Sequence, residues 1–447
     1  MFKKITIAFA ATLITIAGGL FASSAAYAIP SVTRQTGMPC TGCHTVFPEL
    51  NSFGRQFKLR GYTLGAALND KQFPENLPLG VGLQISDTSV KDRYKGADPA
   101  GDFPQSNKPI VQQFALYYGG KIAGNAGAFA QYNYDGIEKK WLAEMVDVRY
   151  ADSTTAGDKE LLYGVTISNS PTTQDVWNSS AMWAFPHILP AGIMPMQTSL
   201  LDMTLANQVG NVGLYSFLDN QFYAEIGFLH NGKNGIFRAL NLGSPLATAI
   251  DGNAPHLRLA WEKNWDSHSF MIGGNAVRAD IFPDAIVQSG PTDRYTDVML
   301  DGQYQYDGGD RQFSLAGSYD REKRSWGANS MASNASDNLY TFKLNGHYWY
   351  QRKIGGGIGF FDYRGDTDNL KYGMMGPGAM NNASGSPDTR GWIAEANWLP
   401  LENRQNVKLG LRYTAYTKFN GASSDYTGAG RNASDNDSLF AYVWMLY

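Results

Sequence analysis

The chain has little charge, almost no cysteine and no long apolar run beyond its N-terminus. Only 17% of its 447 residues are charged and the formal net charge is -3, which argues against a nucleic-acid-binding surface. Its 2 cysteines are too few for a disulfide scaffold. No apolar stretch after residue 22 is long enough for a transmembrane helix. The chain is rich instead in glycine, with 49 residues, and in aromatic residues, at 13%, which suits a large folded body.

The first residues have the pattern of an export signal. Lys3 and Lys4 precede an almost unbroken apolar stretch over 5–22, and the Ala-Tyr-Ala tripeptide at 26–28 has the small-x-small form of a cleavage site. A membrane anchor is the alternative, because the apolar run reaches the lower length limit for a spanning helix. The cleavage site favours a signal peptide over residues 1–28, so the mature chain is expected to leave the cytoplasm.

The two cysteines stand together shortly after this segment. Cys40-Thr41-Gly42-Cys43-His44 has the C-x-x-C-H spacing that attaches haem c through two thioethers and supplies its proximal iron ligand. A redox disulfide and half of a zinc site are the alternatives. The sequence has no second Cys or His pair at zinc-finger spacing and no βαβ pattern around the motif. We therefore predict one covalently bound haem c, held by Cys40, Cys43 and His44, in a cytochrome segment over residues 29–76.

A short helix is expected directly after the motif. Pro48 suits its first turn, Glu49 complements its positive end and Gly61 can close it. Arg55 and Lys58 are candidate partners for the haem propionates, and a solvated face is the alternative for both. One face of this helix is apolar and is expected either to cover the haem plane or to pack against its surroundings. That face consists of Leu50, Phe53 and Phe57.

The rest of the chain, residues 77–447, alternates apolar and polar residues in segments of about ten, bounded by Gly, Asn, Asp or Ser. The segments are mostly joined by tight and long connections in turn, which is typical of outer-membrane barrels, whereas a soluble β-sandwich or a solenoid is the alternative. We predict an all-β fold: an outer-membrane β-barrel of about 16 antiparallel strands, with the cytochrome segment as a plug in its lumen. The strands are expected to begin near residues 77, 108, 125, 140, 159, 204, 221, 255, 268, 294, 311, 338, 356, 390, 406 and 437.

This topology places both chain termini on the periplasmic rim and the long loops outside the cell. Tight turns are expected near 124–125, 157–158, 219–220, 265–266, 308–309, 353–354 and 402–403. Outward-facing aromatic residues are expected to form the girdles at the two membrane interfaces. They are Tyr304, Tyr306, Trp392, Trp398, Tyr442 and Trp444.

The residues around the haem motif also carry a family resemblance. The runs are Arg34-Gln35-Thr36-Gly37-Met38 before Cys40, and Phe47-Pro48-Glu49-Leu50-Asn51, Phe53-Gly54-Arg55, Phe57-Lys58-Leu59 and Gly61-Tyr62 after it. Over residues 30–64 the sequence resembles the fused monohaem cytochrome-porins of iron-oxidising bacteria. The resemblance implies an Fe(II)-oxidising outer-membrane cytochrome that passes electrons to a periplasmic c-type cytochrome or a similar carrier.

The sixth iron ligand and the electron donor are the open questions at this stage. By strand alternation His347 and Met299 face the lumen, so they are candidate distal ligands. A vacant sixth position or another ligand is the alternative, and for His347 so is the role of a hydrogen-bonded lining residue. Two other functions remain open: a haem-bearing conduit for another donor or acceptor, and a passive porin with a haem-containing plug. No oligomeric state is predicted.

Overall fold

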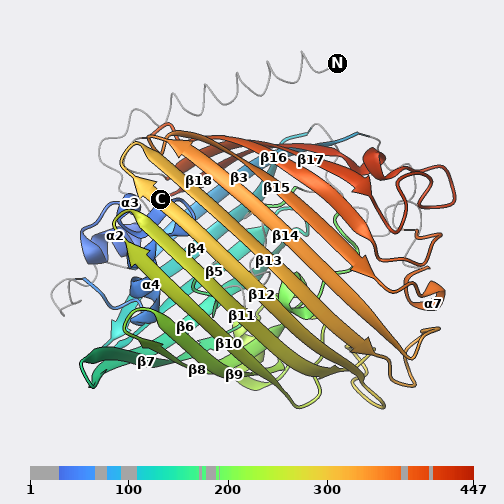
Figure 1. The fold of residues 1–447 in the computed structure, drawn as a ribbon, viewed down its shortest axis with the longest axis horizontal. Helices are drawn as coiled ribbons and strands as arrows, with labels where there is room; N and C mark the ends of the chain where they lie inside the picture. Colours follow the sequence, from blue (N-terminus) through green and yellow to red (C-terminus); the bar gives the residue numbers. More distant parts are fainter. Residues whose placement is uncertain are drawn as a thin grey trace.

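The computed structural model describes residues 30–65, 78–91, 108–170, 174–177, 188–190, 192–373, 381–401 and 406–447. Most of them form one closed antiparallel barrel, in which each strand pairs with its neighbours in sequence and β18 pairs with β3 (Figure 1). The predicted fold class is therefore confirmed, and closure leaves no open sheet edge. No helix within these described ranges is long and apolar enough to cross a membrane. The predicted signal peptide lies outside the described residues.

The barrel has sixteen strands, and each begins within about five residues of its predicted start. Alternation and turn residues mark strands well because both are local properties of the chain. The strands are β3 (Leu79–Val90), β4 (Ile110–Ala123), β5 (Ala126–Asp135), β6 (Lys140–Ala156), β7 (Lys159–Ser168), β8 (Val209–Leu218), β9 (Phe222–Asn231), β10 (Asn253–Trp265), β11 (His268–Ile281), β12 (Asp293–Gly308), β13 (Arg311–Ser325), β14 (Ser336–Tyr350), β15 (Ile354–Gly365), β16 (Thr389–Trp398), β17 (Val407–Lys418) and β18 (Ser438–Leu446).

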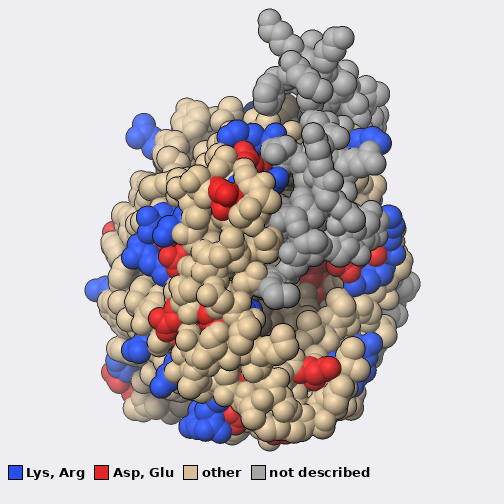
Figure 2. All heavy atoms as spheres, turned by 90° about the vertical axis from the view of Figure 1, so that its right-hand side faces the viewer, with Lys and Arg blue, Asp and Glu red and all other residues tan. Residues whose placement is uncertain are grey.

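The two rims of the barrel differ as predicted. On one rim the strands are joined by tight turns with left-handed backbone, such as Gly124 (φ 50°) and Gly309 (φ 58°). The turn after β14 lies at 351–353, slightly before its predicted place, and the turn predicted at 402–403 falls outside the described residues. The opposite rim carries most of the long connections, which include α6 (Gly235–Leu240), α7 (Asn369–Tyr372) and the 3-10 helix η3 (Ala433–Asn436). Its end-on face shows basic and acidic side chains interspersed (Figure 2).

The outer wall is apolar, as the lipid-facing wall of a membrane barrel must be. Leu214, Ile226 and Ile358 each expose more than half of their surface. This apolar wall identifies the chain as an outer-membrane barrel, with the short-turn rim and the C-terminus on the periplasmic side. Trp392 and Trp398 are about half exposed on this surface, at 50% and 47%, as predicted.

Two of the six predicted girdle residues face inward instead. Tyr442 is buried and its hydroxyl donates to Asn397 Oδ1 at 2.9 Å, and the Trp444 ring lies 4.6 Å from the ring of Phe47 inside the barrel. The prediction for Tyr442 and Trp444 was therefore wrong. The alternation rule failed on β18 because its lumen face is aromatic rather than polar: Trp444 packs on the N-terminal segment, and Tyr442 packs with Ile188 of the β7–β8 connection.

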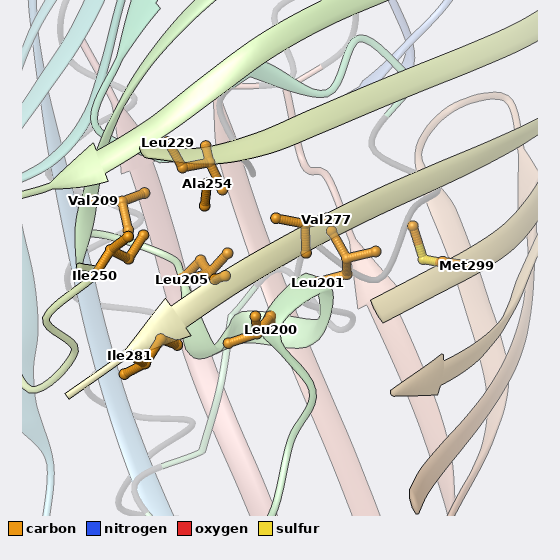
Figure 3. Close-up of a cluster of buried hydrophobic side chains, with 11 residues drawn as sticks. Leu200, Leu201, Leu205, Val209, Leu229, Ile250, Ala254, Val277, Ile281 and Met299 are labelled. Carbon is orange, nitrogen blue, oxygen red and sulfur yellow. The ribbon is translucent and has the colours of Figure 1, made fainter. Parts of the chain in front are cut away.

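Part of the long connection between β7 and β8 folds into the lumen. Its helical turn η1 (Leu200–Thr204) packs in an apolar cluster against the inner wall (Figure 3). The backbone N–H groups of Leu200 and Leu201 donate to Glu322 Oε2 at 2.7 Å and Asp297 Oδ2 at 2.8 Å. The cluster consists of Leu200, Leu201, Leu205, Val209, Leu229, Ile250, Ala254, Val277, Ala279, Ile281 and Met299. These contacts hold the connection inside the barrel.

Candidate functional site

Residues 30–65, called the plug below, lie at the short-turn end of the barrel, close to the C-terminus (Figure 1). The plug contains α2 (Pro30–Thr36), α3 (Cys40–Cys43), β1 (His44–Val46), β2 (Glu49–Leu50) and α4 (Ser52–Leu59). Its residues reach inward-facing side chains on strands around the whole circumference. These partners include Tyr117 on β4, Asp147 on β6, Tyr215 on β8, Glu262 on β10, Gln305 on β12, His347 on β14 and Trp444 on β18. The segment therefore fills this mouth of the barrel.

The C-x-x-C motif forms the single helical turn α3. It ends where the backbone N–H of His44 donates to the Cys40 carbonyl. Neither thiol is part of a disulfide, and burial raises the pKa of Cys40 to about 12 and that of Cys43 to about 11. The single turn holds the two thiols three positions apart, which is the spacing that thioether attachment to one haem requires.

His44 is held in one orientation by the turn that follows it. Its Nδ1 lies 3.1 Å from the carbonyl oxygen of Pro48. A carbonyl only accepts, so Nδ1 carries the hydrogen and Nε2 presents its lone pair. Burial lowers the pKa of His44 to about 4, so the imidazole is neutral at pH 7. A neutral imidazole with Nδ1–H bonded to a backbone carbonyl is the form that ligates iron through Nε2, so this donor set fits a c-type haem.

Asn51 and Gly54 fix the motif to the next helix, and the sequence analysis assigned neither of them a role. The Asn51 side chain accepts from the Gly54 N–H at 2.9 Å and donates to the Gly42 carbonyl at 3.0 Å. A Cβ on Gly54 would stand 2.2 Å from the Cys43 carbonyl oxygen, so α4 can cross α3 here only at a glycine. The preference of Asn for N-cap positions could have identified Asn51 from the sequence. No sequence signal predicts the close contact between Gly54 and the Cys43 carbonyl.

The helix predicted after the motif is present but starts later than expected. It begins at Ser52 behind the Asn51 cap, so Pro48 and Glu49 precede it, and Glu49 belongs to β2. Gly61 follows with φ 66° and closes the helix, as predicted. The start was missed because Pro48 suits a first helical turn, whereas the tertiary fold pairs this stretch with β1 instead.

Arg55 is not available to bind a haem propionate. Its guanidinium is buried and makes a two-point ion pair with Glu262, at 3.0 and 3.1 Å. The remaining N–H groups donate to the Leu50 carbonyl, Gln305 Oε1 and Ser269 Oγ. All five donors are engaged, so Arg55 ties the plug to the barrel wall and the propionate role is not supported.

Lys58 is also directed to the protein interior. Its ammonium donates to the Asp175 carbonyl at 3.1 Å, and the side chain is buried. Burial, and next the charge of Arg149, lower the pKa of Lys58 to about 8. Both predicted propionate partners thus belong to the contact between plug and wall.

The two candidate distal ligands lie apart from the motif. His347 faces the lumen as predicted, and its Nδ1 contacts Glu49 Oε1 at 2.8 Å. Its Nε2 edge points at β15, where a Cβ on Gly357 would stand 2.5 Å away, so this edge faces the wall. Met299 is buried in the apolar cluster around η1. Both side chains therefore have contacts of their own, with Glu49 for His347 and with the apolar cluster for Met299.

Within the described residues, no group of three His, Cys, Asp or Glu side chains is placed to hold a metal ion.

Comparison with known proteins yields structures of the same architecture and no sequence relative. No family model and no curated protein matches the chain. OmpF of Salmonella typhi, solved with daunomycin, is 13% identical with a TM-score of 0.47, and the match covers 83% of this chain and 97% of that one. The outer-membrane channel DcaP of Acinetobacter baumannii has 9% identity, the same TM-score, and coverages of 83% and 96%. An anion-selective porin from Comamonas acidovorans has 11% identity, a TM-score of 0.44, and coverages of 83% and 98%.

Proposed function

We propose that this outer-membrane barrel is a monohaem c-type cytochrome that passes electrons across the outer membrane. The observation that carries the proposal is the turn from Cys40 to His44, with two thiols outside any disulfide and an imidazole whose Nδ1–H is bonded to the Pro48 carbonyl. This turn lies in a plug that fills the periplasmic mouth of a closed barrel. A plain porin has no need of such a donor set.

The residues of the plug have distinct roles in this proposal. Cys40 and Cys43 would hold the haem through thioethers, and His44 would ligate its iron through Nε2. When bound, the haem supplies a one-electron Fe(III)/Fe(II) couple. Pro48 keeps the imidazole oriented, and Asn51 and Gly54 hold the turn against α4. Arg55 and Glu262 tie the plug to the wall, so the motif keeps its place at the mouth.

The proposed electron donor is extracellular Fe(II), and the proposed acceptor is a periplasmic c-type cytochrome or a similar carrier. Each Fe(II) gives up one electron and leaves as Fe(III). The choice of donor is supported by the sequence resemblance over residues 30–64. Keeping the oxidation outside the cell has a physical advantage, because Fe(III) precipitates at neutral pH.

The test is the anaerobic visible spectrum of the detergent-purified, oxidised chain before and after Fe(II) is added, with dithionite as the full-reduction control. We expect c-type bands that Fe(II) reduces. Reduction by dithionite alone would move the function to another donor or acceptor, and a chain without covalent haem would overturn the proposal. His44→Ala should assemble into the barrel yet lose the Fe(II)-dependent signal. The matched control is His230→Ala, whose ring stacks on Phe237 near the opposite rim.

A further inference from the structure

Six cationic side chains gather on the outer wall at the long-loop ends of β11–β16. We propose that this group, called the basic belt below, binds the phosphate groups of anionic lipids in the leaflet on the long-loop side. This inference does not rest on the proposed electron transfer. The basic belt consists of Arg278, Arg294, Arg321, Lys323, Arg364 and Arg390.

Strand register brings these side chains next to one another. Lys323 on β13 and Arg278 on β11 both pair with Thr296 of the strand between them. Arg321 and Arg364 likewise flank Tyr340 on β14. All four alternate with inward-facing neighbours and are exposed to the outside. Residues that share a partner strand lie about two strand spacings, or roughly 10 Å, apart. A lipid headgroup can therefore contact more than one of them.

The depth of the basic belt matches that of a headgroup layer. About 9–11 tilted residues cross the hydrocarbon core, whereas β12, β13 and β14 have 16, 15 and 15 residues. The outward side chains nearer the middle of these strands are apolar, including Leu300, Tyr319 and Phe342, which pair across the strands and are 63%, 50% and 39% exposed. The long-loop ends therefore project beyond the core, where cationic groups meet lipid phosphates.

The basic belt keeps a net positive charge after the neighbouring carboxylates are counted. Asp280 binds Arg294 at 2.8 and 3.2 Å, and Asp362 binds Arg390 at 3.0 and 3.1 Å as well as Arg364. Asp366 accepts from Asn338. Asp388, which also lies near Arg364, is bound by Lys418 on β17 at 3.2 Å and so adds no net charge. The six cations of the basic belt against Asp280, Asp362 and Asp366 therefore leave three positive charges. In the part of the chain that the structure describes, neither Arg278 nor Lys323 has an ion-pair partner. Guanidinium and ammonium groups at such a surface suit phosphate oxygens.

Among the described residues, the long-loop ends of the neighbouring strands β7–β10 carry no such cluster. Their outward residues there are uncharged, as shown by Ile167, Val212, Phe228 and Pro255. The cations border the apolar wall directly. A lipid can place its phosphate on the cations and its acyl chains on the apolar wall, whereas free phosphate can contact only the cations. The partner is therefore a lipid.

The test compares the full-length double variant R321Q/K323Q with the control K263Q/R311Q. The control removes one outward Lys and one outward Arg at the short-turn ends of β10 and β13. Each protein is reconstituted in phosphatidylcholine vesicles with spin-labelled phosphatidylglycerol or spin-labelled phosphatidylcholine, and the motionally restricted lipid fraction gives the relative affinity.

We expect the unmodified chain and the control to prefer phosphatidylglycerol, and R321Q/K323Q to lose that preference by on the order of tenfold. An unchanged preference in R321Q/K323Q, or an equal loss in the control, would overturn the inference. Abolition of the preference by millimolar inorganic phosphate would show that free phosphate, not lipid, is the ligand. Repeating the measurement with His44→Ala keeps the result independent of the haem proposal.

Discussion

The buried ion pair of Arg55 and Glu262 joins the plug to the wall across 207 positions of the sequence. Both side chains are almost fully buried, at 2% and 3% exposure. Arg55→Leu would leave the Glu262 carboxylate buried without its charge partner, so we expect plug docking to weaken by about 3–5 kcal/mol. Limited proteolysis of the plug across a urea series, with the barrel band as internal reference, measures this loss.

Arg60 provides the matched control for that measurement. It pairs with Glu160 at 2.8 Å, but the two side chains are 25% and 37% exposed. Solvent screening limits Arg60→Leu to about 0–1 kcal/mol. The double variant R55L/E262L should recover much of the loss, because it removes both charges together. Equal proteolysis of Arg55→Leu and Arg60→Leu would contradict the anchoring role.

Asn51 is expected to affect cofactor content more than assembly. Asn51→Ala removes the α4 cap and the hydrogen bond to the Gly42 carbonyl, for a loss of about 1–2 kcal/mol in the plug. A looser turn presents the two thiols less well, so covalent haem per barrel should fall. Haem-stained gels normalised to protein measure this ratio. Ser52→Ala, one position further on, should leave it unchanged, and an equal fall in both variants would assign the effect to general damage.

At the scale of single residues, some members of the candidate site could be predicted from the sequence and others could not. Cys40, Cys43 and His44 could be named because haem chemistry fixes their spacing within five positions. The partner of Arg55 could not, because a side chain at one position of α4 meets β10 only after the barrel has closed. His347 was assigned to the lumen by alternation, but the direction of its ring depends on Gly357 of the next strand.

At the scale of elements, the strands and the place of the plug were predictable, whereas the packing of the plug was not. Strand starts follow from alternation and turn residues that lie within a few positions of one another. The face of β18 depends on contacts with the plug, and the start of α4 depends on the pairing of β1 with β2 inside the plug. The local sequence pattern predicted the wrong face for Trp444, whose ring packs on Phe47 inside the barrel. It also predicted the wrong element for Pro48, which precedes the helix.

The crossing of α3 and α4 is expected to tolerate only glycine at position 54. A Cβ at 2.2 Å from the Cys43 carbonyl oxygen must push the helix away from the haem motif. Gly54→Ala should therefore reduce covalent haem strongly while heat-modifiable gel migration shows a folded barrel. Gly346→Ala on β14 is the control, since its Cβ would have its closest contact at 3.6 Å. Normal haem content in Gly54→Ala would show that the crossing adjusts without cost to the site.

At the scale of the whole molecule, the plug and η1 obstruct the same lumen at different places. The plug contacts strands around the short-turn mouth, and η1 packs on the inner wall of β9–β12 in the apolar cluster. An electron conduit has no need of an open pore, and a leak would let solutes cross with the electrons. The arrangement therefore suits electron transfer better than solute diffusion.

Conductance measurements distinguish electron transfer from solute diffusion as the function of the barrel. A sixteen-stranded barrel leaves an aqueous channel unless its interior is filled, so deletion of residues 30–65 should produce conductance steps in planar lipid bilayers. The full chain should show few such steps, and so should Arg60→Leu, which keeps the buried anchor. Arg55→Leu should open intermittently, because the weakened plug leaves the mouth for part of the time. Steady conductance of the full chain, equal to that of the deletion variant, would show that the plug does not seal the lumen and would favour a passive porin.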